Sequence, residues 1–584
     1  MDKKKFEGPP LTRRQFTKGA TAAAFAAMLG PNWPKILEKA RAQSMVLPNE
    51  WDAEHDVVVV GGGVAGAAAC LGAWENKADV VLLESAPAIG GTSAMSGGMF
   101  HLGGGTKLQR DLGVYETEED YYQYLVANAE LSEVEHGIPN QPSGVRYLQR
   151  VHVDHSVETF DFLEDELGLI FLRLLATPAT NMSFGGLMFI GQEHHPSVLK
   201  KVRRGFPHLH TQSAMGVGLM KKFEEYLRGK DIPIMTMTKA NHLIMDPITG
   251  AAIGVKAIRR GKELNIKAKR GVVLAGGGHG HAGAIKSLIN ELPLSSIEDA
   301  SFRPAGCDGS GIRMGLEVGG DFFACDGGQF LTAMWGTLAL PLAGMLFLDP
   351  WWNGIYVGRD GKRFTSEEYH MTATECYWYH TGKWNWQTKR WDLLPAGWMI
   401  FDAASRAAMF GINGAPAKAA GIGGLMTGKP TTEFEIPGYG KALRCKIVSG
   451  RTLESLCAGS RETDPEGLGI NPKGLKETID QWNRYQPYDP TCGRTHGMLP
   501  IKAPPYYAAP LWITNFNEAT GILIDENGQV LNTSGELIPR LYSAGRNSGG
   551  QFGQFYPCGM AVSSGFTIGR VAGGNVARES RWVE

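Results

Sequence analysis

Short apolar runs that end in glycine mark both ends of this chain. Residues 56–60 (DVVVV) lead directly into residues 61–66 (GGGVAG), residues 79–84 (DVVLLE) form a second run, and residues 271–278 (GVVLAGGG) form a third. A continuous apolar run of this length, bounded by a glycine turn, is typical of a buried parallel strand that feeds a helix. The pattern therefore predicts an α/β fold from residue 52 to about residue 349.

The pattern changes in the middle of the chain and returns at its end. Residues 350–516 are rich in Trp, Tyr and Pro, and their hydrophobic periodicity is poor. Residues 521–525 and 541–545 again predict strands, and residues 559–577 predict a closing helix rich in small side chains. The chain thus divides into a first α/β part (52–349), an inserted segment (350–516) and a second α/β part (517–584).

The first glycine turn has the spacing of a dinucleotide-binding motif. Gly61 permits a tight turn, Gly63 lets the backbone approach a pyrophosphate, and Gly66 lets the next helix pack closely on the strand. The helix then directs its N-terminal N–H groups at the phosphates. Glu84 ends the second strand about 20 residues later, where an acid accepts hydrogen bonds from an adenosine ribose. Strand, turn, helix and acid together predict a Rossmann-type βαβ unit.

The segment after Glu84 indicates which dinucleotide binds. Residues 85–98 (SAPAIGGTSAMSGG) resemble a run that lies along the flavin in the FAD-dependent family of fumarate reductase, urocanate reductase and 3-ketosteroid dehydrogenase. The resemblance extends from about residue 56 to residue 574. It implies an α/β fold in which a Rossmann-type FAD-binding domain carries an inserted α+β capping domain over the flavin. Membrane-bound succinate dehydrogenases attach FAD through a histidine near this run, and Gly91 stands at that position, so we expect non-covalent FAD.

The motif and the resemblance together nominate the residues that contact FAD. They lie after the first strand, in the run after Glu84 and after the strand at 271–275. Others lie in the second α/β part, after the strand at 541–545 and at the start of the closing helix. The expected cofactor contacts are Gly61, Gly63, Val64, Ala65, Gly66, Glu84, Ser85, Gly90, Gly91, Thr92, Ser93, Met95, Ser96, Gly97, Gly98, Ala275, Gly276, Gly277, Gly545, Arg546, Gly559, Ala561 and Val562.

Two absences bear on the substrate. The fumarate reductases have an Asn-Arg-Leu-Gly-Gly run whose arginine grips one carboxylate, where this chain has residues 555–559 (FYPCG). They also have a His-His-Thr-x-Gly-Gly run for the second carboxylate, where this chain has residues 516–521 (FNEATG). A dicarboxylate needs two cationic or strongly donating groups. We therefore do not expect fumarate or urocanate as the substrate.

Tyr556 suggests a different substrate. Tyr556-Pro557 resembles the Tyr-Pro pair of the 3-ketosteroid dehydrogenases, in which a tyrosine hydroxyl and a nearby backbone N–H bind a ketone oxygen. Loss of a proton beside a ketone puts negative charge on that oxygen, and a preorganised donor stabilises it. Met560 stands where the steroid enzymes have the glycine that supplies the N–H. Tyr556 is thus an oxyanion donor or, alternatively, a core tyrosine.

The proton-transfer group has several candidates. Arg406 lies at the spacing of the fumarate reductases' acid arginine, and Tyr369 is nearest to the cap tyrosine of the steroid enzymes, with Tyr377 and Tyr379 behind it. A second tyrosine of those enzymes has no counterpart between Tyr147 and Tyr226. The histidines in that gap are further candidates or are structural: His194, His195, His208 and His210.

Aromatic side chains crowd the front of the inserted segment. They line a pocket for a bulky apolar ketone, or they pack the core of the cap or a partner surface. The residues are Trp351, Trp352, Tyr356, Tyr377, Trp378, Tyr379, Trp384, Trp386, Trp391 and Trp398.

Composition is that of a large enzyme with substantial cores. The 584 residues are 43% hydrophobic, and a net charge of −1 gives no indication of nucleic acid as a partner. Eight cysteines include no Cys-x-x-Cys and no haem attachment motif, and we expect no metal. For such an enzyme we expect a periplasmic protein or a quinone as the electron partner. Alternative functions are an enoate reductase with relocated carboxylate clamps and the electron-transfer subunit of a membrane complex.

The N-terminus has the form of an export signal. Residues 12–18 (TRRQFTK) contain the twin arginines Arg13 and Arg14, and a mild apolar run covers residues 20–29. That run is too short for the roughly 20 residues of a membrane-spanning helix. We expect residues 1–42 to be removed after Ala42 and the protein to work in the periplasm or at the outer face of the membrane. A basic amphipathic tail is the alternative.

Overall fold

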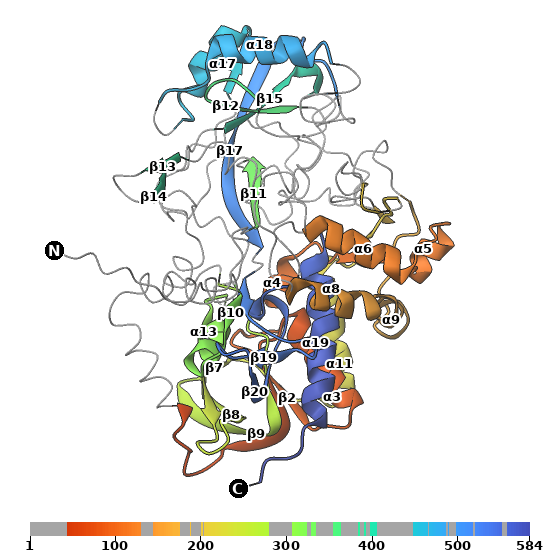
Figure 1. Ribbon diagram of the computed structural model, residues 1–584, viewed down its shortest axis with the longest axis vertical. Coiled ribbons are helices and arrows are strands. Elements are labelled where there is room, and N and C mark those ends of the chain that lie inside the picture. Colours follow the sequence, from red (N-terminus) through yellow and green to blue (C-terminus); the bar gives the residue numbers. More distant parts are fainter. Residues whose placement is uncertain are drawn as a thin grey trace, which may run out of the picture.

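The chain folds into an α/β lobe and a second lobe built on a smaller sheet (Figure 1). The computed structural model describes residues 44–129, 144–175, 187–188, 200–202, 204–279, 307–323, 329–334, 354–363, 383–385, 390–392, 397–405, 448–464, 467–485, 489, 498–517, 520–551 and 557–583.

The main sheet is mixed, with a parallel centre. Its strands run in the order β19-β20-β9-β1-β2-β6, and β7 and β8 extend it as an antiparallel meander beside β9. The parallel strands are β1 (Ala53–Val60), β2 (Val80–Leu83), β6 (Ile234–Met235), β9 (Lys262–Leu274) and β20 (Leu537–Ser543); the others are β7 (Thr238–Met245), β8 (Ala252–Arg259) and β19 (Gln529–Leu531). The apolar runs at 56–60, 79–84, 271–275 and 541–543 thus form buried parallel strands, which confirms the predicted α/β fold.

The predicted strand at 521–525 is shorter in the structure. Only β18 (Gly521–Ile522) is continuous, and it pairs antiparallel with β10 (Phe322–Phe323). Ile524 makes an isolated bridge to Val530 of β19, so the turn at 526–528 connects this segment to the edge strand of the main sheet.

Two helices rich in small residues pack against each other beside the sheet. Helix α3 (Val64–Glu75) follows β1, and α19 (Met560–Arg578) closes the chain, as the sequence predicts. Side chains are almost absent where they touch: a Cβ added to Gly569 would lie 2.4 Å from the carbonyl oxygen of Ala65, and one added to Gly573 would lie 2.0 Å from that of Ala69. The glycines therefore set the distance between the two helix backbones.

This contact yields a prediction with a control in the same helix. We expect Gly573→Ala to lower the free energy of unfolding by about 2–3 kcal/mol, because the methyl group overpacks the contact. An added Cβ on Gly574 would lie 3.3 Å from the side-chain amide nitrogen of Asn76 and 3.9 Å from the carbonyl oxygen of Gly72, so Gly574→Ala should be neutral or stabilise by up to about 1 kcal/mol through helix propensity. Denaturant unfolding of both variants measures the difference. Equal stabilities would contradict the close contact.

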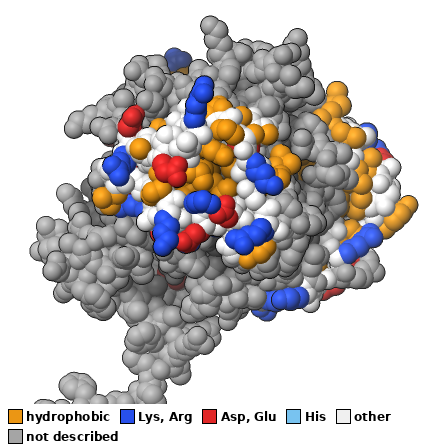
Figure 2. Space-filling view, turned by 90° about the horizontal axis from the view of Figure 1, so that it is seen from above, with side chains coloured by type: hydrophobic (Ala, Val, Ile, Leu, Met, Phe, Trp, Pro, Cys, Tyr) orange, Lys and Arg blue, Asp and Glu red, His pale blue; other side chains and the backbone are white. Residues whose placement is uncertain are grey.

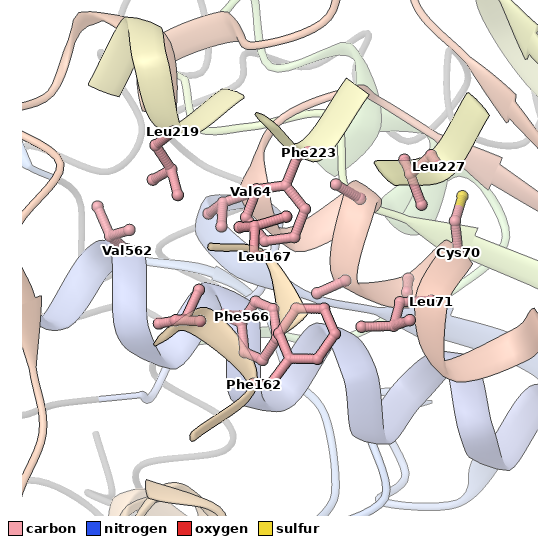
Figure 3. Close-up of a cluster of buried hydrophobic side chains, with 14 of the residues drawn as sticks. Val64, Cys70, Leu71, Phe162, Leu167, Leu219, Phe223, Leu227, Val562 and Phe566 are labelled. Carbon is pink, nitrogen blue, oxygen red and sulfur yellow. The ribbon is translucent and has the colours of Figure 1, made fainter. Parts of the chain in front are cut away.

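A hydrophobic core joins these helices to a third (Figure 3). Leu219, Phe223 and Leu227 extend from α11 (Met215–Gly229) toward Leu71 of α3 and Phe566 of α19. The same lobe contains α4 (Gly91–Met95), α5 (Lys107–Asp111), α6 (Glu118–Ala129), α8 (Gly144–Asp154), α9 (Ser156–Asp161), the π-helical turn η1 (Phe162–Glu166), and a small sheet of β3 (Phe100–His101), β4 (Leu187–Met188) and β5 (Leu209–His210). Helix α13 (Ser310–Glu317) belongs to a second core, in which Ile312 packs with main-sheet residues such as Val58 and Leu274.

The cap has its own sheet and core. Its strands are β11 (Gln329–Met334), β12 (Ile355–Gly358), β15 (Gly397–Asp402), β16 (Val448–Gly450) and β17 (Tyr506–Asn517), with helices α17 (Leu453–Ser460) and α18 (Pro472–Trp482) and a hairpin of β13 (Lys383–Asn385) and β14 (Arg390–Asp392). Strand β11 pairs along β17. The boundary predicted at 349/350 therefore falls inside the cap, because the cap sheet takes a strand from the segment before it.

The described cap aromatics mostly serve the cap itself. Trp398 is fully buried and donates to Thr463 Oγ1 at 2.9 Å, and Tyr356 is buried on β12. Trp384 and Trp391 are register partners in the β13–β14 hairpin. For Trp398 and Tyr356 the core interpretation holds. The remaining six aromatics lie outside the described residues.

The outer face of the cap is a mixed surface. Seen from above, Lys, Arg, Asp and Glu side chains are interspersed with hydrophobic ones (Figure 2). On α18 the ion pair Lys476–Asp480 lies at 2.6 Å, and Lys362 reaches Glu477 at 2.5 Å. Over the part of the chain that the structure describes, no helix combines the length and the apolar character needed to cross a bilayer.

Candidate cofactor and active site

The first glycine turn is fixed by the packing of the protein on itself. Gly61 has φ +103°, and a Cβ there would lie 2.3 Å from the carbonyl oxygen of Ala275. A Cβ on Gly66 would lie 1.8 Å from the carbonyl oxygen of Gly61. Both glycines are therefore required before any ligand binds, since the ends of β1 and β9 and the start of α3 meet here.

Gly63 differs from its two neighbours. A Cβ on Gly63 would meet nothing closer than Ser93 Oγ at 3.4 Å and the carbonyl oxygen of Gly90 at 4.0 Å. Gly63 is the N-cap of α3, and the Val64 N–H donates to Ser93 Oγ at 3.1 Å. The space beside Gly63 and the positive end of α3 together fit a pyrophosphate.

Glu84 is held at the carboxyl end of β2 with one face toward the glycine turn. Its Oε2 accepts the Gly62 N–H at 2.8 Å, and its Oε1 accepts the Ala86 N–H at 2.8 Å and the Ser85 hydroxyl at 3.1 Å. These donors orient the buried carboxylate. Oε2 has a second lone pair, so the carboxylate fits its predicted role as acceptor for a ribose hydroxyl.

The run after Glu84 forms a half-buried border of the site. Residues 91–97 are neither buried nor fully exposed, and α4 begins at Gly91. Gly91 has φ +49°, and no atom lies within 4 Å of an added Cβ. Thr92 Oγ1 contacts Cys307 Sγ at 3.0 Å, which ties the run to the segment beyond β9. Small residues beside open space leave room for a flat ring system to lie along this run.

The tail completes the same site from the other side. Gly545 begins the 3₁₀ turn η7 (Gly545–Asn547) with φ +65°, and a Cβ there would lie 2.6 Å from the Cβ of Ala65. The Asn547 Oδ1 is buried without a hydrogen-bond partner among the described residues, and it lies 3.5 Å from the Cβ position of Gly276. This acceptor, Ala65 of α3 and the glycines after β9 are therefore gathered at one place.

Helix α19 starts at the border of this site. Its N-cap Gly559 has φ +85°, and a Cβ there would lie 2.9 Å from the backbone N of His101. The Met560 N–H donates to the carbonyl oxygen of Pro557 at 3.0 Å. Met560 therefore uses in a local turn the N–H that the steroid enzymes' glycine directs at a ketone.

The predicted cofactor residues all lie in described parts of the chain. The contacts above bring the glycine turn, Glu84, Ser93, Ala275 and Gly545 together, and the run that begins at Gly90 leads to the start of α19. The residues present fit FAD: Glu84 and the start of α3 would hold its nucleotide end, and residues 91–98 and the start of α19 would border its ring system. The sequence did not predict the roles of Ser93 Oγ and Asn547, because both depend on contacts between distant segments.

The predicted catalytic residues Tyr556, Tyr369 and Arg406 lie outside the described residues, as do His194, His195, Tyr377 and Tyr379. His208 and His210 are described, and both are fully buried. His208 Nε2 pairs with Glu116 Oε1 at 2.7 Å, and His210 Nε2 with Thr106 Oγ1 at 2.8 Å. These two rings are therefore parts of the interior and do not open on a pocket.

Comparison with known proteins identifies the family. The family described as "FAD binding domain" matches residues 56–561. An NADH:acrylate oxidoreductase of Vibrio harveyi is 26% identical over 89% of this chain, and the chain spans 50% of that protein's length. A urocanate reductase of Eggerthella lenta is 26% identical over 96% of this chain and 80% of its own.

The fold has solved counterparts. A crystal structure of 3-ketosteroid-Δ4-(5α)-dehydrogenase from Rhodococcus jostii, in complex with 4-androstene-3,17-dione, superposes with a TM-score of 0.68 at 23% identity over 91% of this chain and 98% of that one. At this identity the likeness concerns the fold. Together with the match over residues 56–561 and the geometry of the site, it leads to one conclusion: the chain belongs to the FAD binding domain family and is an oxidoreductase with FAD as its cofactor.

Proposed function

We propose that the protein desaturates or reduces a C=C bond conjugated with a ketone, on a bulky apolar substrate. The observation that carries the proposal is the sequence at the start of α19, where Tyr556-Pro557 stands in place of a carboxylate-binding arginine. Pro557 lies directly before this helix, and the N-cap Gly559 lies beside His101, which follows the run at residues 91–98. FAD, when bound, supplies the hydride acceptor or donor for such a reaction.

Residues of the chain itself bind the ketone oxygen and transfer the proton. The Tyr556 hydroxyl donates to the ketone oxygen and stabilises the negative charge that develops there as the neighbouring carbon gains or loses a proton. Because the Met560 N–H is bonded to the Pro557 carbonyl, this donation falls mainly to Tyr556. Arg406 and Tyr369 remain the candidates for moving the proton.

Relatives support two versions of this chemistry. The solved dehydrogenase of similar fold binds a steroid ketone, which favours an apolar ketone. The acrylate and urocanate reductases among the relatives have names that imply carboxylate substrates. The second candidate is therefore an enoate reductase whose carboxylate clamps lie elsewhere in the cap.

A substrate survey separates the two candidates. Purified FAD-loaded protein with an artificial electron donor or acceptor is assayed against steroid enones, phenolic enones, acrylate, urocanate and fumarate. We expect turnover with at least one enone. With fumarate we expect no turnover at the rates typical of enzymes, tens per second. Turnover confined to the carboxylates would replace the ketone proposal with the enoate reductase.

We also propose that the protein is exported by the twin-arginine route, which accepts folded proteins and so suits an enzyme that collects FAD first. Replacing Arg13 and Arg14 with lysine keeps the charge and removes the signal that the export receptor reads. We expect the precursor of this double variant to stay in the cytoplasm, as measured by cell fractionation against the wild type. An unchanged periplasmic yield would refute the signal.

A further inference from the structure

Beneath the start of α19 lies a cluster of buried histidines and tyrosines that the proposed chemistry does not use. The histidine–tyrosine cluster comprises His101 of β3, Tyr121 and Tyr124 of α6, His152 of α8, and His208 and His210 at β5. Tyr124 is 2% exposed and the other five are fully buried. Among the described residues, no group of three or more His, Cys, Asp or Glu is placed to hold a metal ion, so a different role is needed.

A chain of hydrogen bonds runs through the cluster to α19. His101 Nδ1 lies 2.8 Å from the Tyr121 hydroxyl, which lies 3.1 Å from His152 Nε2. His152 Nδ1 then lies 3.0 Å from Thr567 Oγ1, in the second turn of α19. The chain therefore links β3 to α19 through α6 and α8.

A second set of contacts holds His208 beside this chain. Glu116 Oε1 pairs with His208 Nε2 at 2.7 Å, while Glu116 Oε2 accepts from Gln109 Nε2 at 2.8 Å and from the Gly104 N–H at 2.9 Å. The His208 ring stacks on His101 and on Tyr124, at centroid distances of 5.0 and 4.5 Å. His101 is thus held by the hydrogen bond to Tyr121 and by stacking on the His208 ring.

Burial keeps the imidazoles of the chain neutral. Burial, together with repulsion from His208, His152 and His210, holds the pKa of His101 well below its ordinary value. Burial lowers the pKa of His152 to about 4, although its bond to the His101 carbonyl oxygen opposes the shift. A neutral imidazole has one donor and one acceptor nitrogen. The His152 ring is therefore suited to link Tyr121 and Thr567 in a fixed order, and His101 joins the chain through Nδ1.

The cluster lies at the flavin end of the FAD site. Glu84 and the start of α3 would hold the nucleotide end of FAD, and residues 91–98, which lead directly into β3, would hold its ring system. An added Cβ on Gly559 would lie 2.9 Å from the backbone N of His101, and Tyr121 and Tyr124 share a hydrophobic cluster with Met560. The first turn of α19 therefore rests on the histidine–tyrosine cluster.

We propose that His101, Tyr121 and His152 are positioning residues that hold the first turn of α19, and hence its positive end, at a fixed distance from the flavin ring of FAD. The N-terminus of a helix stabilises nearby negative charge, and the effect falls off within one turn. Reduction adds negative charge to the flavin, so a displaced helix stabilises the reduced cofactor less. The proposal rests on FAD binding and not on the choice of substrate.

Paired tyrosine variants test this role. Tyr121→Phe removes the central hydroxyl of the chain and keeps the ring. Tyr542→Phe is the matched control, because Tyr542 is 3% exposed and its hydroxyl donates to Glu579 Oε1 at 2.9 Å, beyond the C-terminal end of α19. We expect similar losses of thermal stability in both variants. Only Tyr121→Phe should lower the midpoint potential of bound FAD, by about 30 mV for a tenfold weaker preference for the reduced form.

Thr567 provides a second test if Tyr121→Phe fails to fold with FAD. Thr567→Val keeps the shape and removes the hydroxyl, whereas Thr567→Ser restores a hydroxyl. We expect Thr567→Val to lower the midpoint potential and Thr567→Ser to recover it. Unchanged potentials in Tyr121→Phe and Thr567→Val, equal shifts in Tyr121→Phe and Tyr542→Phe, or failure of Thr567→Ser to recover the potential would each overturn the proposal. Because the potential is measured without substrate, the outcome is independent of the proposed reaction.

Discussion

Replacing Gly63 with valine is expected to yield a folded protein that has lost its FAD. The side chain would occupy the space beside the positive end of α3, where the nearest protein atom to an added Cβ is Ser93 Oγ at 3.4 Å. The protein itself can accommodate the change, but a pyrophosphate cannot share that space. We expect FAD to bind at least about 100-fold more weakly, equivalent to about 2.7 kcal/mol. Titration of the apoprotein with FAD measures the loss, and circular dichroism measures the fold.

Gly66→Val is the matched control for this prediction. A Cβ on Gly66 would lie 1.8 Å from the carbonyl oxygen of Gly61, so this variant should lose the fold of the turn together with FAD. Retention of FAD by Gly63→Val would contradict the assignment of the nucleotide end. Acid denaturation of the wild type should also release the yellow cofactor, because Gly91 has no side chain to link it covalently.

Tyr556→Phe is expected to cause the largest loss of activity. Removal of one preorganised oxyanion donor lowers turnover by about 10²–10³-fold. The loss should appear mainly in kcat, since the interaction strengthens as charge develops on the ketone oxygen. FAD content and stability should be unchanged, because the substitution keeps the aromatic ring. Steady-state kinetics with the best enone found in the survey provides the measurement.

The control for Tyr556→Phe is again Tyr542→Phe, which removes a buried tyrosine hydroxyl on β20. That variant should keep full turnover. If Tyr556→Phe instead loses FAD or stability and its residual enzyme keeps normal kcat, Tyr556 is a core residue. The resemblance to the steroid enzymes would then be incidental, and Arg406 would be the starting point for the mechanism.

The FAD site was predictable because its signals are local. The run 56–60 is apolar without interruption, so it indicates a strand buried on both faces, and the glycines after it have the spacing that a phosphate turn requires. The acid that ends β2 follows at the expected distance. Each of these features depends on neighbours in the sequence, and the structure brings them together as predicted.

Features that depend on contacts between residues far apart in the sequence were not predicted. His101 follows Phe100 in a two-residue strand, and His210 follows Leu209, so neither shows a period that marks a buried polar network. Their partners Tyr121 and His152 come from separate helices. The start of the cap depends on such a contact too: β11 lies before the predicted boundary at 349/350, and only its pairing with β17 joins it to the cap sheet.

Fully reduced enzyme mixed anaerobically with an enone or with fumarate tests the proposed function most directly. In this single half-reaction, return of the yellow absorption of oxidised flavin reports electron transfer to the substrate, and no external electron partner is needed. We predict rapid return with a bulky apolar enone and none with fumarate on the same time scale, because residues 555–559 lack the arginine that grips a carboxylate. Rapid return with fumarate, and none with any enone, would contradict the proposed function.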